Sequence, residues 1–172
     1  QTLIDAITSD PAWNAGWYKS NEDVHNGLRL HARLFAVMGW STEFFRQEKW
    51  RGLGFASVGD FQTGFTEAYF TPMDPNDLLC MLGKWQRGDV SRMTNGDLPE
   101  ALGRIKAKVY VMPIDSDMFF VPSDCKLEQE LIPNSEFHEL HSIAGHLGLF
   151  GVEPEFYQAI DSHIERLLAY EP

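Results

Sequence analysis

The sequence predicts an α/β protein, and more closely the C-terminal part of a larger α/β domain into which a helical module is inserted. Two observations carry this prediction. The last seventy residues alternate between strand-like and helix-like patterns, whereas residues 26–102 show helical patterns and no convincing strand. Two parallel strands cannot cover their own faces and edges, and such pairs occur inside larger layered sheets. We therefore expect further strands from another chain or from a segment outside these 172 residues.

The composition supports one globular domain and excludes several classes of protein. Hydrophobic residues make up 44% and aromatic residues 13% of the chain, which supplies a core and excludes disorder. No stretch of membrane-spanning length is free of charged or polar residues. The formal net charge of −11 argues against nucleic acid and against an anionic membrane as partners.

Two cysteines, Cys80 and Cys125, are too few for a disulfide framework. Because no signal-like stretch opens the chain either, we expect a cytoplasmic protein. Because the chain starts at Gln1 and not at Met, we expect processing or trimming.

Residues 1–20 predict a short helix followed by a loop, and we assign residues 1–25 to the α/β core. Residues 26–102 carry three groups of apolar residues at helical spacing, separated by glycine and proline. These groups are Leu30, Leu34 and Met38; Phe61, Phe65 and Tyr69; and Leu78, Leu82 and Trp85. We expect the aromatic residues of this module to lie mostly in its core.

Residues 103–172 predict the order β-α-β-α. The first strand is expected over 106–114, and the second over 136–142. Between them, Pro122 opens a helix for which Ser123 is the expected N-cap, and Pro133 stops it. This order implies adjacent parallel strands with a right-handed crossover.

The clearest amphipathic helix of the chain begins at Pro154, after a loop expected over 145–148. Its apolar face is built from seven residues at helical spacing: Phe156, Ala159, Ile160, His163, Ile164, Leu167 and Leu168.

Asp117 and His146 are the strongest candidates for catalytic residues. Asp117 follows the first predicted strand, and His146 lies in the loop after the second. The carboxyl ends of parallel strands meet at one edge of a sheet, where ligands bind. A carboxylate at that edge can orient an imidazole so that its other nitrogen acts as a general base. This order fits the last two members of a Ser…Asp…His triad.

Five segments, in matching order and spacing, resemble motifs of the homoserine O-acetyltransferase-like branch of the α/β-hydrolases. They are Ile7–Tyr18, Gly27–Ser41, Met73–Leu79, Asp115–Pro122 and Gly145–His146. The resemblance covers nearly the whole chain. It implies an α/β-hydrolase fold in which residues 26–102 form a helical lid and residues 1–25 and 103–172 belong to the core.

The resemblance implies that Asp117 is the triad acid and His146 the triad base. The family's serine nucleophile lies in a Gly-x-Ser-x-Gly turn upstream of these motifs. This chain contains no such turn, because the Gly39-Trp40-Ser41 sequence lies within a helical pattern. The expected partner is therefore an N-terminal α/β-hydrolase half that carries the serine.

The resemblance also implies the reaction: an ester or thioester acylates the serine, and the acyl group passes to an alcohol or to water. We expect no cofactor and no metal, although acyl-CoA is a candidate co-substrate, and a homodimer is one option for assembly. Arg33, Trp40 and Leu147 are the expected substrate-binding residues.

Two departures from the family pattern argue against homoserine as the acceptor. Leu147 stands where homoserine-specific members carry an Asp that can meet the substrate amine, and Pro72 stands where acetyltransferases often have Arg. A buried amine without a carboxylate partner would be poorly held.

Three other interpretations stay open. The chain is a non-catalytic fragment or a protein-binding partner if no serine-bearing half accompanies it. A zinc site built from His138, His141 and His146 is disfavoured, because residues three apart on a strand face opposite sides. The Asp115-Ser116-Asp117 sequence also occurs in magnesium-dependent phosphoryl transfer, but the other residues that this chemistry needs are not convincing.

Overall fold

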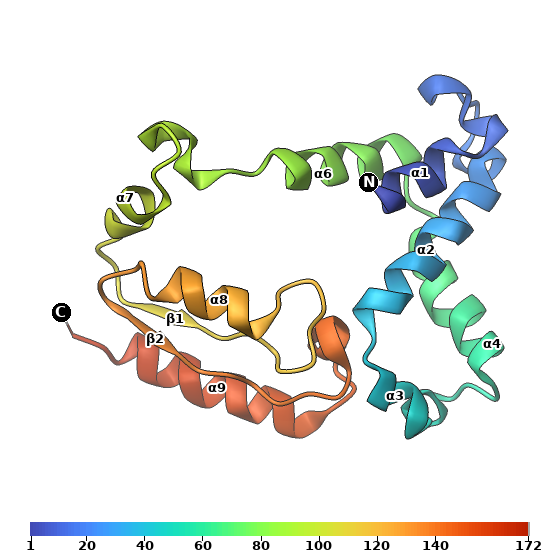
Figure 1. The fold of residues 1–172 in the computed structure, drawn as a ribbon. Coiled ribbons are helices and arrows are strands. Elements are labelled where there is room, and N and C mark those ends of the chain that lie inside the picture. The colour runs from blue at the N-terminus through green and yellow to red at the C-terminus, as the bar shows by residue number, and fades with distance from the viewer. Residues whose placement is uncertain (172) are drawn as a thin grey trace. The chain divides into compact units, whose positions relative to one another are not determined.

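The structure is a computed structural model that describes residues 1–171, and most of its regular elements are helices (Figure 1). It divides into two units. The first comprises residues 1–37 and 45–88, and the second comprises residues 38–44 together with the chain from Asp89 onward. The predicted boundaries between core and lid, at residues 25 and 102, stay a prediction.

The first unit is entirely helical. Its elements include α1 (Thr2–Thr8), η1 (Pro11–Gly16), η2 (Asn21–Val24), most of α2 (His25–Gly39), η3 (Lys49–Leu53), α4 (Val58–Phe61), η4 (Gln62–Glu67), α5 (Ala68–Phe70) and α6 (Pro75–Arg87). The η elements are 3-10 helices except η4, which is a π-helical turn between α4 and α5.

Helix α2 buries a different face from the one that its large residues suggested. Leu28, Ala32 and Ala36 are buried, whereas Leu30 and Met38 of the expected group are exposed. The buried side begins at Gly27, where an added Cβ would lie 2.9 Å from the carbonyl oxygen of Ile7. Small residues therefore allow α1 and α2 to approach closely.

The expectation that the aromatic residues lie in the core is confirmed for Trp50 and Phe61, which are buried. Tyr69 and Trp85 are exceptions, because they are about half exposed.

The second unit contains the sheet. Its elements are α3 (Thr42–Arg46, shared with the first unit), η5 (Val90–Thr94), α7 (Leu98–Gly103), β1 (Val109–Val111), α8 (Pro122–Gln129), β2 (Ser135–Phe137), η6 (Gly145–Phe150) and α9 (Pro154–Leu168). Both strands are shorter than predicted, but their pairing is confirmed. They are parallel, with Tyr110 opposite Glu136, and one further parallel bridge joins Ile114 to Leu140.

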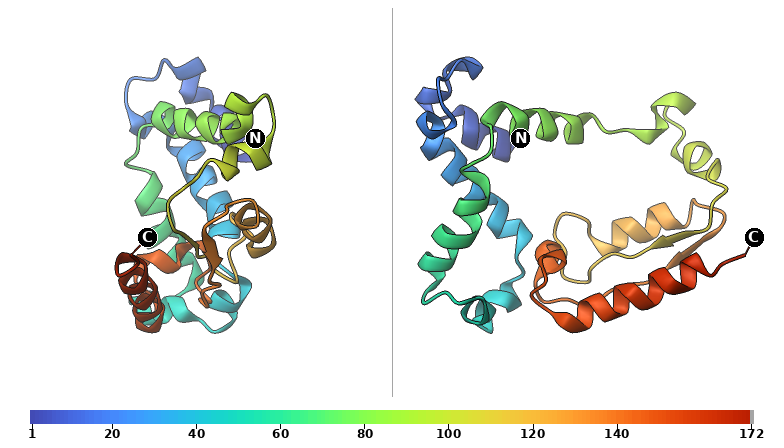
Figure 2. Two further views of the ribbon diagram at one scale, coloured as in Figure 1. Left: turned by 90° about the vertical axis from the view of Figure 1, so that its left-hand side faces the viewer. Right: turned by 180° about the vertical axis from the view of Figure 1, so that it is seen from behind.

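Helices α8 and α9 lie on opposite sides of this two-stranded sheet (Figure 2). Ile114, Leu140 and Phe156 form a buried apolar cluster, so α9 packs on the sheet through the face that the sequence predicted. Farther along α9, Ile164 and Leu168 are exposed in this structure. No helix within residues 1–171 is long and apolar enough to span a membrane.

Two local predictions in this unit are wrong. Ser123 does not cap α8, because the helix begins one residue earlier at Pro122, with Val121 in the N-cap position and no side-chain cap. Proline fits the first helical position, where no backbone N–H is needed. Residues 145–148 form part of the 3-10 helix η6 instead of a loop.

Candidate active site

Asp117 and His146 are in direct contact. The His146 Nδ1 atom lies 3.0 Å from the Asp117 Oδ2 atom. Asp117 follows β1, and His146 is the second residue of η6, which follows β2. The bridge between Ile114 and Leu140 aligns the chain just before both residues, so parallel pairing delivers them to the same sheet edge.

The turn after β1 holds the Asp117 carboxylate. Its Oδ1 atom accepts hydrogen bonds from the backbone N–H groups of Phe119 at 2.7 Å and Phe120 at 3.1 Å. The Oδ2 atom is left to face the imidazole. The side chain of Asp117 is only 5% exposed, and that of His146 is 27% exposed. The carboxylate is thus buried and fixed, while solvent still reaches the imidazole.

The backbone before His146 requires glycine. Gly145 has φ of +65°, and an added Cβ would lie 2.9 Å from the carbonyl oxygen of Gly39 and 3.0 Å from the backbone nitrogen of Ser41. Both the left-handed conformation and the close approach exclude larger residues. The Gly145-His146 sequence therefore has a structural reason in this turn.

Ser41 lies between α2 and α3, and not in a strand-to-helix turn. Its hydroxyl group donates to the carbonyl oxygen of Ile143 and accepts from the backbone N–H of Phe44. These bonds, together with its burial, give Ser41 a structural role in place of that of a nucleophile.

A pocket of about 410 Å³ borders the Asp117–His146 pair. Its walls are mainly apolar and come from β1, η6 and α9, with Met112, Leu149 and Ile160 among them. Cys125 also lines it, and burial, helped by nearby carboxylates, raises the pKa of this thiol. A raised pKa disfavours the thiolate, so Cys125 is a poor nucleophile.

The three expected substrate-binding residues lie in different settings. Leu147 is buried next to His146 in η6. Trp40 is buried in the same unit and stacks on Phe44, with ring centroids 4.2 Å apart. Arg33 belongs to the other unit, where its Nε atom lies 2.6 Å from an oxygen of Glu67.

The buried carboxylate of Glu67 was not foreseen from the sequence. It accepts from Arg33 and also from Arg29, whose Nε atom lies 2.8 Å away. Burial acts to raise the pKa of Glu67, but the two arginines together outweigh burial and hold that pKa below its ordinary value. The sequence gives one weak signal for these ion pairs, which is the presence of opposite charges in two helical segments that lie far apart along the chain.

The three histidines of the zinc hypothesis have separate partners. His138 contacts Glu136 at 3.0 Å, and His141 contacts Asp115 at 2.5 Å. His146 pairs with Asp117. Among residues 1–171, no three His, Cys, Asp or Glu side chains are placed to hold a metal ion together.

The chain was compared with known proteins in sequence and in structure. No family model matches the sequence. Ethyl acetate hydrolase of Pseudomonas veronii is 57% identical over 98% of this chain and 48% of its own length. The crystal structure of an acetylester hydrolase from Corynebacterium glutamicum is 50% identical, covers 99% of this chain and 49% of that one, and superposes with a TM-score of 0.96.

The resemblance extends to homoserine O-acetyltransferases. The enzyme from Methanococcoides burtonii is 32% identical over 83% of this chain and 32% of its own length. The crystal structure of the Bacillus anthracis enzyme shares the fold at 20% identity, with a TM-score of 0.81 over 99% of this chain and 48% of that one.

The parallel strands, the strand-end Asp–His pair and these likenesses together define the C-terminal part of an α/β-hydrolase fold. Within that superfamily, the chain belongs to the homoserine O-acetyltransferase-like branch, which includes the esterases above. It spans about half the length of the two esterases named above.

Proposed function

We propose that this chain supplies the acid and the base of a Ser-His-Asp triad that hydrolyses short esters through an acyl-enzyme. The observation that carries the proposal is the contact between Asp117 and His146 at the carboxyl ends of two parallel strands. The names of two similar proteins, an ethyl acetate hydrolase and an acetylester hydrolase, support an ester as the substrate.

The geometry suits the work of a general base. Asp117 accepts the Nδ1–H of His146, which leaves the lone pair on Nε2 for the reacting serine. His146 would take the proton of the serine hydroxyl as the serine attacks the ester carbonyl, and would then pass it to the leaving alcohol. A water molecule, activated by the same imidazole, would release the acid.

The serine must come from outside the residues of this chain. Within residues 1–171, β1 pairs with β2 alone, so its other edge is open to a further strand. The apolar pocket beside the catalytic pair includes Val111, Met112 and Pro113 of that same strand region. We propose that a serine-bearing α/β-hydrolase half adds its sheet at this edge, which would cover the apolar surface and bring the nucleophile to His146.

Leu147 favours water over an amino alcohol as the acyl acceptor. It is buried beside His146, and it offers no carboxylate to a substrate amine. Hydrolysis is therefore the favoured reaction and transfer to homoserine the disfavoured one. Acyl-CoA as a donor and Arg33 as a ligand for an anionic group stay predictions.

The test uses the complete enzyme, in which this chain accompanies its serine-bearing half, with p-nitrophenyl acetate as the substrate. His146→Ala should abolish turnover and leave the thermal unfolding midpoint close to that of the wild type. His141→Ala is the matched control, because His141 also contacts a carboxylate of the same turn but is largely exposed. Turnover that survives His146→Ala would refute the proposed function.

A further inference from the structure

We propose that Glu153 is a positioning residue for His146, and that it acts through Ser142 and the backbone of Ala144. This inference rests on the proposed function, because it concerns the same base. Glu153 directly precedes α9, and Ser142 lies in the segment that leads from β2 to η6.

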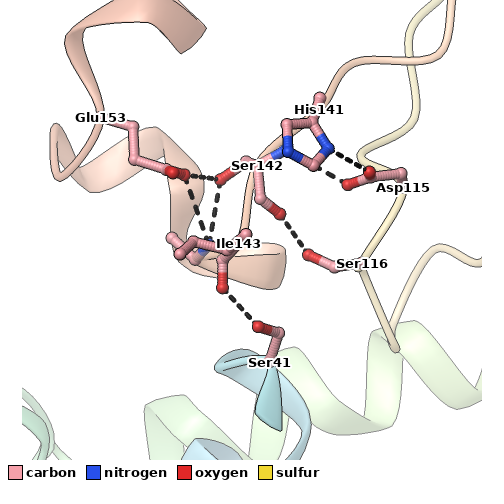
Figure 3. Close-up of polar contacts among 8 residues, drawn as sticks. Ser41, Asp115, Ser116, His141, Ser142, Ile143 and Glu153 are labelled. Carbon is pink, nitrogen blue, oxygen red and sulfur yellow. Dashed lines mark hydrogen bonds and ion pairs between the residues drawn. The ribbon is translucent and has the colours of Figure 1, made fainter. Parts of the chain in front are cut away.

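The carboxylate of Glu153 binds two groups of that segment (Figure 3). Its Oε2 atom accepts a hydrogen bond from the Ser142 hydroxyl group and lies 3.4 Å from the backbone nitrogen of Ala144. The same N–H of Ala144 points at the Ser142 Oγ atom, 3.1 Å away. Glu153, Ser142 and Ala144 thus form a closed triangle of hydrogen bonds two residues before His146.

Further contacts hold the neighbouring peptide groups. The Ser116 hydroxyl group donates to the carbonyl oxygen of Ser142, and the Ser41 hydroxyl group donates to that of Ile143 (Figure 3). Three consecutive residues, 142 to 144, are therefore each fixed by a side chain from another segment. Ser116 is also the residue before Asp117, so one of these bonds ties the segment of the acid to the segment of the base.

Glu153 is placed to cap its own helix but does not do so. It is the N-cap residue of α9, and its side chain makes no capping hydrogen bond there. A carboxylate at this position usually accepts from the first N–H groups of the helix. Here it turns to the 142–144 segment instead, and Ser142 is fully buried beneath it.

The consequence concerns the imidazole. Ala144 is the N-cap of η6, whose second residue is His146, so a displaced Ala144 moves the ring relative to Asp117. A misplacement of about 1 Å in a catalytic group can slow a reaction roughly 100-fold. We expect Glu153→Gln to lower kcat about 10- to 100-fold while KM changes less than about 2-fold, because Glu153 is not among the residues that line the pocket beside His146.

The experiment compares Glu153→Gln with Glu155→Gln in the complete enzyme, with p-nitrophenyl acetate as the substrate. Glu155 is exposed in the first turn of α9, so its replacement removes a similar charge near the same helix end. Ser142→Ala and the double variant with Glu153→Gln complete a double-mutant cycle. The NMR signal of the His146 Nδ1 proton supplies a readout that a loss of stability alone would not move.

If Glu153 positions His146, then Glu153→Gln and Ser142→Ala each lower kcat, the double variant is no slower than the slower single one, and the Nδ1 proton signal shifts or broadens. Glu155→Gln keeps the wild-type kcat. Equal kcat values for Glu153→Gln and Glu155→Gln, or a loss that follows only the unfolding midpoint, would overturn the proposal. If Glu153→Gln does not fold, Ser142→Ala decides by the same criteria. Activity that survives His146→Ala would instead mean that the proposed function itself fails.

Discussion

Replacing Asp117 by asparagine separates the chemistry of the proposed base from the stability of the turn that holds it. In the structure, Oδ1 of Asp117 accepts two backbone N–H groups and Oδ2 faces the imidazole of His146. The amide oxygen of an asparagine can keep both backbone bonds. Its NH₂ group would then point at His146 Nδ1, where the carboxylate oxygen had accepted a proton.

The expected magnitude follows from this reversal. An NH₂ group donates, so His146 would have to accept at Nδ1 and carry its own proton on Nε2. That tautomer cannot take a proton from serine. The same substitution in a serine protease costs about 10⁴ in kcat, which corresponds to roughly 5.5 kcal/mol in the activation free energy. Because the two turn bonds are kept, the free energy of unfolding should change by less than about 1 kcal/mol.

The assay measures initial rates of ester hydrolysis by the complete enzyme, together with thermal unfolding followed by circular dichroism. Asp124→Asn is the matched control, since Asp124 is an exposed acid in the first turn of α8, seven residues along the chain. It should keep the wild-type rate. A rate for Asp117→Asn within about tenfold of the wild type would refute the role of Asp117, because the wrong tautomer cannot sustain base catalysis.

Three further predictions concern stability. Two arginines hold the pKa of Glu67 below its ordinary value, against the opposite effect of burial. The Glu67 carboxylate therefore stabilises the fold above that ordinary pKa, and this stabilisation fades as the pH falls through the lowered pKa. Glu67→Gln should cost about 2 kcal/mol, or roughly 4–8 °C in Tm. A hydrogen bond with Asp115 raises the pKa of His141, so the stabilisation of the fold by protonated His141 is complete below about pH 6.5 and is lost as the pH rises through the raised pKa. His141→Ala should remove this pH-dependent loss, which urea unfolding midpoints at about pH 6 and pH 9 would show. Gly145→Ala should destabilise the fold by about 1–3 kcal/mol, whereas Gly103→Ala, with open space around its Cβ, should be tolerated in the same thermal unfolding assay.

The contact between Asp117 and His146 was predictable because it depends on local patterns and one general rule. A short apolar run and a polar turn locate Asp117, and parallel pairing brings the ends of two consecutive strands together. The amphipathic helix at the C-terminal end was predictable in the same way, since its apolar spacing repeats over four turns. Strand lengths were overestimated, because the pattern of the sequence continues beyond the last ladder bonds.

The features that could not be predicted all depend on contacts between distant segments. Arg33 and Glu67 are 34 residues apart, and a π-helical turn of the kind that contains Glu67 has no reliable sequence signature. The exposed positions of Tyr69 and Trp85 depend on which helix face finds a neighbour. Glu153 occupies an ordinary helix-capping position in the sequence, and only the structure shows its hydrogen bond with Ser142.

The distribution of contacts explains how half of an α/β-hydrolase fold can hold Asp117 against His146. Among residues 1–171, the hydrogen bonds of the Asp117 side chain come from its own turn and from His146. The segment before His146 is likewise fixed by Ser41, Ser116 and Glu153, all within the second unit. The geometry of the pair is thus set by residues of this chain, whereas the proposed nucleophile would come from the serine-bearing half. On the proposed assembly, the serine-bearing half would add the reacting oxygen and exclude water at the open edge of β1, and it would not need to build the base.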